Sequence, residues 1–141
     1  MSESGKHKPE GFYTMKGYAA IDTDTLTTAM EDYLEMIYRF HINNEIIRIK
    51  SLSSALNVKP SSASKMADAL KKKGLIDYVK YGQITLTEEG KKRGEYLLFR
   101  HDVLHHFLCH INNSKDELSQ VEKIEHFLNE ETICNIAKML E

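Results

Sequence analysis

Residues 51–76 read SLSSALNVKPSSASKMADALKKKGLI, and their order of apolar, turn and helix-capping residues is the clearest indication of the fold. Ser51 can cap a first short helix, Asn57 supplies a turn, and Pro60 suits the first turn of a second helix. The second helix is expected to stop at Gly74, because glycine readily adopts the left-handed conformation of a helix C-cap. The pattern predicts a helix-turn-helix unit whose second helix presents small polar and basic side chains near its N-terminus.

The flanking sequence predicts a mainly helical chain with one small β-hairpin. Apolar residues recur at helical spacing before this unit, and two short β-type runs joined by Tyr81-Gly82 follow it. In chain order, the other expected elements are a helix from 25 to about 42, a very short strand at 46–49, hairpin strands at 75–79 and 84–87, a helix of roughly 25 residues from Thr87, and helices over about 115–128 and 131–140.

These elements predict two domains and a tail. We expect a flexible N-terminal tail at 1–24, a winged helix-turn-helix DNA-binding domain at 25–90, and a linker helix with a helical dimerisation domain at 91–141. The 141 residues contain no run of about 18 apolar residues and no apolar core of a secretion signal near the start. We therefore expect a cytoplasmic protein with no membrane partner.

The charge of the chain is unevenly distributed. A formal net charge of −2 provides no general attraction to nucleic acid. Residues 59–80 nevertheless contain six lysines and two aspartates, a local charge of +4, whereas residues 113–141 contain three lysines and seven acids, a local charge of −4. One end of the chain is suited to an anion and the other to a different partner.

The candidate DNA-reading residues lie at the start of the second helix and at the hairpin tip. Short side chains there would let the backbone enter the major groove while lysine and serine reach phosphates and base edges. The candidates are Lys59, Ser61, Ser62, Ser64 and Lys65 on the helix and Lys80 and Tyr81 on the hairpin. The alternative is that the serines only cap a helix and the lysines form a solvated face.

The candidate metal ligands are carboxylates and imidazoles at helical spacing. Glu122, Glu125 and His126 follow an i, i+3, i+4 pattern, which predicts one face of a single helix. Asp32 and Glu35 are spaced likewise on the first helix, and His101 lies on the long helix expected between them. Such acids are often merely solvated, but both sets border apolar stripes, where unpaired carboxylates are costly and a divalent cation would offset that cost.

Five segments of the chain resemble the diphtheria toxin repressor family, and specifically its manganese transport regulator branch. They are MEDYLEMIY at 30–38, VKPSSASKM at 58–66, YGQITLTEEGKKRG at 81–94, RHDVL at 100–104 and VEKIEHFL at 121–128. The resemblance implies a manganese-responsive repressor of metal-uptake genes that binds double-stranded operator DNA as a homodimer. It also implies that Asp32, Glu35, His101, Glu122, Glu125 and His126 hold a binuclear pair of Mn²⁺ ions.

The resemblance also bears on the choice of metal. In the iron-responsive branch, soft methionine and cysteine ligands stand where this chain has Asp32 and Glu122, so the hard donors here favour Mn²⁺ over Fe²⁺. Fe²⁺, Zn²⁺, Co²⁺ or Cd²⁺ are expected to substitute. An additional site among His105, His106 and His110 is conceivable, although these side chains can equally be surface or interface histidines.

Three alternatives to the metal-dependent repressor remain open. A winged-helix regulator that responds to an organic ligand, or to none, would leave the acids on the surface. A di-metal carboxylate enzyme would also use helix-borne Glu and His ligands, but it would have no use for the helix-turn-helix and wing. A metal-buffering protein would bind metal without operator preference. We expect a regulator with no enzymatic activity and no small organic substrate.

Overall fold

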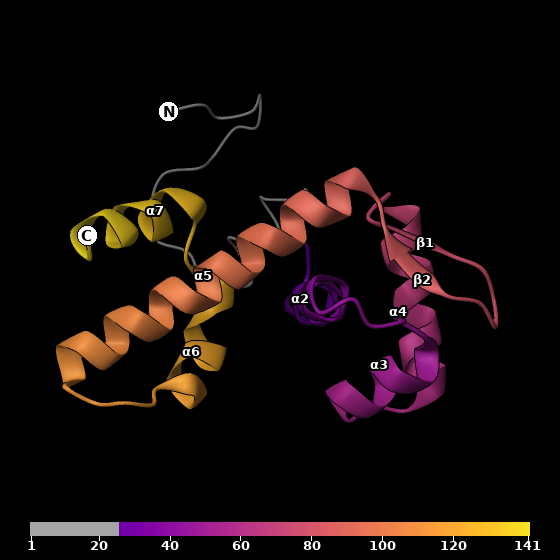
Figure 1. Cartoon of the computed structure of the whole chain (residues 1–141), viewed down its shortest axis with the longest axis horizontal. Helices are drawn as coiled ribbons and strands as arrows, with labels where there is room; N and C mark the ends of the chain where they lie inside the picture. Colours follow the sequence, from indigo (N-terminus) through magenta and orange to yellow (C-terminus); the bar gives the residue numbers. More distant parts are fainter. Residues whose placement is uncertain (1–25) are drawn as a thin grey trace, which may run out of the picture.

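The computed structural model describes residues 26–141 of the chain, so the predicted tail at 1–24 lies outside the described residues. The described part is mainly helical with one two-stranded hairpin, as expected (Figure 1). Its elements are α2 (Thr28–Ile42), α3 (Ile49–Leu56), α4 (Pro60–Lys72), β1 (Ile76–Tyr78), β2 (Ile84–Leu86), α5 (Glu88–Asn112), α6 (Leu118–Ile124), the 3₁₀ turn η1 (Glu125–Phe127) and α7 (Glu130–Met139).

The helix-turn-helix is present, but its first helix begins earlier than predicted. α3 starts after Arg48, and Ser51 lies inside its first turn, where the serine Oγ accepts a hydrogen bond from the Arg48 backbone N–H at 3.1 Å. Ser51 thus completes the cap from within the helix and is not the capping residue itself. The left-handed Asn57 supplies the turn, and Pro60 opens α4 as expected.

The wing is an antiparallel hairpin in which Ile76 pairs with Leu86 and Tyr78 with Ile84. The strand expected at 46–49 is reduced to a single bridge between Ile47 and Ile84, because the helical conformation of α3 already begins at residue 49. In both strands buried side chains alternate with exposed ones, so one face of the hairpin packs on the core.

Thr87 joins the wing to the long helix. Its Oγ1 donates a hydrogen bond to the Gly74 carbonyl at 2.7 Å and accepts one from the Gly90 N–H at 3.0 Å, which caps α5 as predicted. Gly74 has φ +76°, the left-handed conformation expected where α4 ends. The start of α5 is therefore held against the end of α4.

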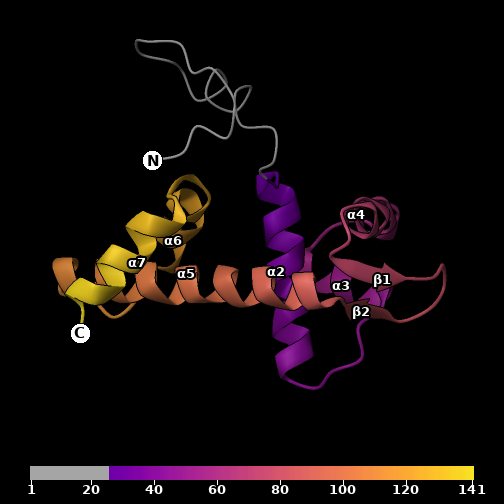
Figure 2. The ribbon, with the colours of Figure 1, turned by 90° about the horizontal axis from the view of Figure 1, so that it is seen from above.

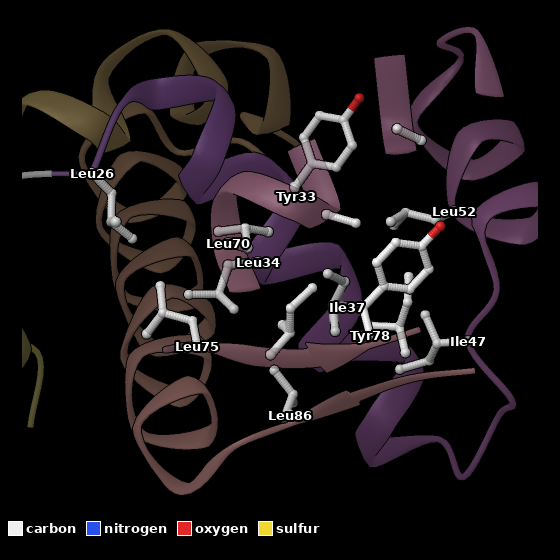
Figure 3. Close-up of a cluster of buried hydrophobic side chains, with 14 of the residues drawn as sticks. Leu26, Tyr33, Leu34, Ile37, Ile47, Leu52, Leu70, Leu75, Tyr78 and Leu86 are labelled. Atoms are coloured by element: carbon white, nitrogen blue, oxygen red, sulfur yellow. The ribbon is translucent and has the colours of Figure 1, made fainter. Parts of the chain in front are cut away.

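α5 is the axis of the molecule and takes part in two separate hydrophobic cores. The first core gathers α2, the helix-turn-helix, the hairpin and Leu97 of α5; Figure 3 shows Leu34, Leu70 and Leu75 among its side chains. The second core lies along the C-terminal half of α5. It joins Val103, Leu104 and Leu108 of α5 to Val121 of α6 and Ile133 of α7. Figure 2 shows α2 crossing α5 in the half of α5 that lies nearer the hairpin, away from α6 and α7.

The C-terminal segment departs from the prediction. The single helix expected over 115–128 is divided into α6 and the 3₁₀ turn η1, after which Leu128 is extended and Asn129 caps α7 through its side chain. The tighter turn and the new cap end the regular helix at Ile124. Within residues 26–141, no helix combines the length and the apolar character needed to cross a membrane.

Gly90 should be intolerant of a side chain. A Cβ added there would lie 1.9 Å from the backbone oxygen of Leu75, so α5 would have to move away from the wing. We expect Gly90→Ala to lower the free energy of unfolding by about 1–3 kcal/mol despite the better helix propensity of alanine. Chemical denaturation would measure the loss, with the exposed Glu95→Ala on the same helix as control; equal stability of both variants would contradict the packing described.

Candidate metal centre and DNA-reading face

Acidic and imidazole side chains from α2, α5 and η1 converge between the two hydrophobic cores. The first half of α2 supplies Asp32 and Glu35, α5 supplies His101, and η1 supplies Glu125 and His126. An open pocket of about 520 Å³ borders this cluster and is lined in part by Glu122 of α6. The structure therefore brings the six predicted metal ligands to one region of the molecule.

Two groups of three ligands can be distinguished within the cluster. In the first, ligand atoms of Asp32, Glu125 and His126 all lie within 4.8 Å of one another, and His126 Nε2 is 3.0 Å from Asp32 Oδ1. In the second, ligand atoms of Glu35, His101 and Glu125 meet the same distance limit. Glu125 belongs to both groups and is the side chain that links them.

His101 is surrounded by three carboxylates. Its Nδ1 lies 3.4 Å from Glu125 Oε1, 3.7 Å from Glu122 Oε2 and 3.9 Å from Glu35 Oε2. Glu122 lies at the rim of the cluster, with 57% of its side chain exposed, whereas the Glu125 side chain is fully buried. Glu122 can therefore reach an ion beside His101 from the solvent side.

The prediction that Glu122, Glu125 and His126 share one face of a single helix was wrong in its local geometry. Glu122 lies on α6, while Glu125 and His126 lie on η1. The 3₁₀ turn directs Glu125 into the interior, and His126 reaches Asp32 on α2. The residues meet as expected, but through a change of helix type that the spacing alone does not reveal.

Two residues of this region were missed from the sequence. Glu31 Oε1 lies 2.8 Å from His126 Nδ1 and accepts a hydrogen bond from Arg100 Nη2 at 3.1 Å. Each directly precedes a predicted ligand, Asp32 or His101, and each lies within a segment that resembles the family. This adjacency in sequence could have suggested both residues, although it does not indicate which neighbour of a predicted ligand points inward.

The surroundings shift the pKa values of the cluster. Contact with the Asp32 carboxylate, and then with Glu31, raises the pKa of His126 to about 10. Contact with Glu125 raises the pKa of His101, and partial burial together with the Glu125 carboxylate raises the pKa of Glu122 to about 7. Burial raises the pKa of Glu35 even though Arg39 hydrogen bonds to its carboxylate. Without metal, protons in the cluster therefore partly neutralise its acids.

The cluster meets the chemical requirements of a divalent cation. Both oxygens of Glu125 and the Nδ1 of His101 are buried and have no hydrogen-bond partner among the described residues; their 3.4 Å approach does not have hydrogen-bond geometry. Buried polar atoms without partners are costly, and a cation would satisfy all three. The donors are carboxylate oxygens and imidazole nitrogens, without a thiolate or thioether, which suits hard or borderline divalent ions.

The histidines further along α5 form no comparable site. His105 Nε2 lies 3.6 Å from Cys109 Sγ and 3.9 Å from Asp116 Oδ1, while His106 and His110 are exposed. Across residues 26–141, the two groups that share Glu125 are the only sets of three side chains close enough to hold an ion. The additional site considered from the sequence is therefore not assembled in the structure.

The predicted DNA-reading residues lie together on the outer side of α4 and the hairpin. Ala63 and Ala67 face the core, which leaves the intervening serine and lysine side chains partly or fully accessible. The hairpin tip approaches the start of α4, so that Ser61, Ser64, Lys80 and Tyr81 line one hollow of about 610 Å³. The accessible candidates are Lys59, Ser61, Ser62, Ser64, Lys65, Lys80 and Tyr81.

Two basic residues modify that expectation. Arg48 lines the same hollow, and its Nη1 donates to the Tyr81 carbonyl at 3.5 Å, so a residue outside the predicted set joins this face. Lys71 instead donates to the Tyr78 carbonyl at 2.7 Å, which links the end of α4 to the wing. The face is therefore basic, but the ammonium group of one lysine between 59 and 80 is already hydrogen bonded within the protein.

Two family models together match nearly all of the described chain. The N-terminal DNA binding domain of the iron dependent repressors matches residues 25–84, and their metal binding and dimerisation domain matches residues 87–141. The chain belongs to the iron-dependent repressor family. It is a metal-dependent, DNA-binding transcriptional repressor and not an enzyme, which confirms the resemblance drawn from the sequence.

Individual members of the iron-dependent repressor family agree with this assignment. The HTH-type transcriptional regulator MntR of Oceanobacillus iheyensis is 41% identical over 115 residues, which span 81% of this chain and 78% of that protein. The X-ray structure of the metal-dependent transcriptional regulator MtsR superposes with a TM-score of 0.72 at 26% identity, covering 82% of this chain and 54% of that one. A manganese-dependent transcriptional repressor in complex with manganese gives a TM-score of 0.69 at 25% identity, with coverages of 79% and 52%. This chain spans about half the length of those two solved chains.

The pKa shifts predict that metal binding releases protons. Because the pKa values of His126 and Glu122 are raised, both groups hold protons near neutral pH that a metal ion must displace. We expect metal affinity to rise about tenfold or more per pH unit between about pH 6 and pH 8. Calorimetry in two buffers of different ionisation enthalpy would count the released protons. An affinity independent of pH would contradict these protonation states of His126 and Glu122.

Proposed function

We propose that the signal sensed by this repressor is Mn²⁺, bound as a pair of ions by Asp32, Glu35, His101, Glu122, Glu125 and His126. The observation that carries the proposal is the fully buried Glu125, which belongs to both groups of donors and whose two oxygens have no hydrogen-bond partner among the described residues. The all-hard donor set supports manganese over iron, and the similarity to a solved manganese-dependent repressor supports the same choice. Fe²⁺, Zn²⁺, Co²⁺ and Cd²⁺ are expected to occupy the same ligands in vitro.

In this proposal, the ions supply positive charge that links the two halves of the chain. Asp32 and Glu35 belong to α2, which packs in the core of the helix-turn-helix, whereas Glu122, Glu125 and His126 lie beyond α5. Without metal, the clustered carboxylates repel one another and the arrangement competent for DNA is only partly populated. A coupling of about 1–3 kcal/mol would tighten DNA binding by roughly 5- to 150-fold.

The DNA-bound form would be a homodimer. Two recognition helices can read an operator when their centres lie about 34 Å apart on one face of the duplex, and a monomer would bind weakly. We propose that residues 25–90 read DNA and that 91–141 form the dimer through α6, α7 and part of α5. Exposed apolar side chains in that half, including Phe99, Ile111, Phe127 and Met139, support an interface there.

The regulated genes would be those for manganese uptake, repressed when the metal is abundant. This assignment follows from the proposed signal, because a metal-activated repressor lowers import once its own metal accumulates. A chain whose target is DNA acts in the cytoplasm, and we propose that location on this ground. Neither a membrane partner nor an organic substrate is part of the proposal.

The metal switch can be tested directly on operator DNA. Fluorescence anisotropy of a promoter fragment from a manganese-uptake gene would be titrated with protein in EDTA and then in Mn²⁺, at one fixed salt concentration. We expect Mn²⁺ to tighten binding at least several-fold, and Glu122→Ala/Glu125→Ala to remove that response. Glu45→Ala/Glu88→Ala removes the same charge from two exposed positions outside the metal centre and the proposed dimer interface, and it should respond as wild type. Equal affinity with and without metal would exclude the switch.

The DNA face makes a separate prediction. Lys65→Ala should weaken operator and non-operator binding alike and lower the slope of log affinity against log salt by about one, because one phosphate contact is lost. Lys115→Ala, an exposed lysine in the loop between α5 and α6, provides the matched control and should leave the slope unchanged. The proposed DNA face is wrong if both variants behave alike in such a salt titration.

A further inference from the structure

An ion pair that belongs to neither ligand group lies at the inner edge of the metal centre. Glu31 is on α2 and Arg100 is on α5, and their 3.1 Å contact is well shielded, with 15% of the Glu31 side chain and 3% of the Arg100 side chain exposed. Beside it, the Arg100 guanidinium lies 5.9 Å from the centre of the Tyr96 ring. The pair is thus part of the packed interior and not a solvated surface contact.

The pair contacts one nitrogen of His126. Glu31 Oε1 lies 2.8 Å from His126 Nδ1, and Arg100 Nη2 lies 3.4 Å from the same nitrogen. A carboxylate oxygen can only accept, so at 2.8 Å His126 Nδ1 must carry the hydrogen and donate it. The other ring nitrogen, Nε2, then remains to face Asp32, whose Oδ1 is 3.0 Å away.

We infer that Glu31, held in place by Arg100, is a positioning residue that fixes the orientation and tautomer of His126 for metal binding. In a metal-bound imidazole one ring nitrogen binds the ion and the other carries an N–H. When this N–H donates to a carboxylate, the ring is oriented and becomes a stronger ligand. Arg100 cannot accept a proton or a hydrogen bond, so its role is to hold Glu31 Oε1 against Nδ1. The inference rests on the proposed function, since it takes His126 as a ligand.

α2, which packs in the DNA-binding half, contributes to the metal centre in two ways. Asp32 would contact an ion directly, whereas Glu31, one residue earlier on α2, acts on the ion through His126. A shift of α2 would therefore disturb a ligand and the support of another ligand together. This predicts that the loss of Glu31 weakens metal binding without removing any metal-ligand bond.

The test is Glu31→Gln in the full chain, which keeps the shape of the side chain and removes its charge. Free Mn²⁺ measured by electron paramagnetic resonance should show affinity lowered by about 10- to 100-fold. Glu88→Gln, an exposed residue paired with Lys91, is the matched control and should bind as wild type. If Glu31→Gln does not fold, Glu31→Asp keeps the charge, shortens the reach and should weaken binding in the same direction.

A second measurement separates positioning from mere stabilisation. In the Zn²⁺-loaded, ¹⁵N-histidine-labelled protein, the wild type should show a hydrogen-bonded Nδ1–H for His126, and Glu31→Gln should shift or lose that signal. The inference would be overturned if the Mn²⁺ affinity stayed within about twofold of wild type and the Nδ1–H signal did not change. Loss of a group that hydrogen bonds to a metal ligand normally alters metal affinity by more than that. Wild-type protein that binds no Mn²⁺ would overturn the proposed function instead, so the two failures are distinguishable.

Discussion

The burial of one carboxylate, that of Glu125, is the constraint on which the rest of the metal centre depends. Placing an ionised carboxylate in the interior without hydrogen bonds costs on the order of several kcal/mol unless nearby positive charge offsets the loss of hydration. Burial alone would raise the pKa of Glu125, but the contacts with His101 and Glu122 and the charge of Arg100 together lower it, so the group remains an anion. A buried anion between two sets of donors is poorly satisfied by protein alone and well satisfied by cations.

Local chain geometry creates that burial, and it limits what the sequence alone can predict. The helix-turn-helix, the wing and the start of α5 could be predicted because Pro60, Gly74 and Thr87 act locally, the first two through backbone conformation and Thr87 through a side-chain cap. The 3₁₀ turn at Glu125 could not be predicted, since i, i+3, i+4 spacing fits either helix type. The six proposed ligands followed from the resemblance, whereas Glu31 and Arg100 required the three-dimensional packing of α2 against α5.

Charge counting along the sequence was similarly useful but incomplete. The excess of lysines between 59 and 80 correctly indicated a basic face on a chain with an overall negative charge. Lys71, however, is hydrogen bonded to the backbone of the wing, while Arg48 from outside the segment joins the face beside Tyr81. Side-chain hydrogen bonds over long sequence separations decide which charges remain available to phosphate, and linear charge cannot reveal them.

The separation of the two cores explains why a small ion can control a protein of this size. Each half has its own apolar cluster, and α5 runs through both, so neither half needs the other for most of its packing. Between α2 and the turn η1, His126 makes polar contacts with Glu31 and Asp32. Polar contacts between charged groups respond to protons and cations, whereas apolar contacts do not. Because carboxylates and imidazoles connect the two halves, the proposed cations would change the strength of this connection and leave the stability of each core largely unchanged.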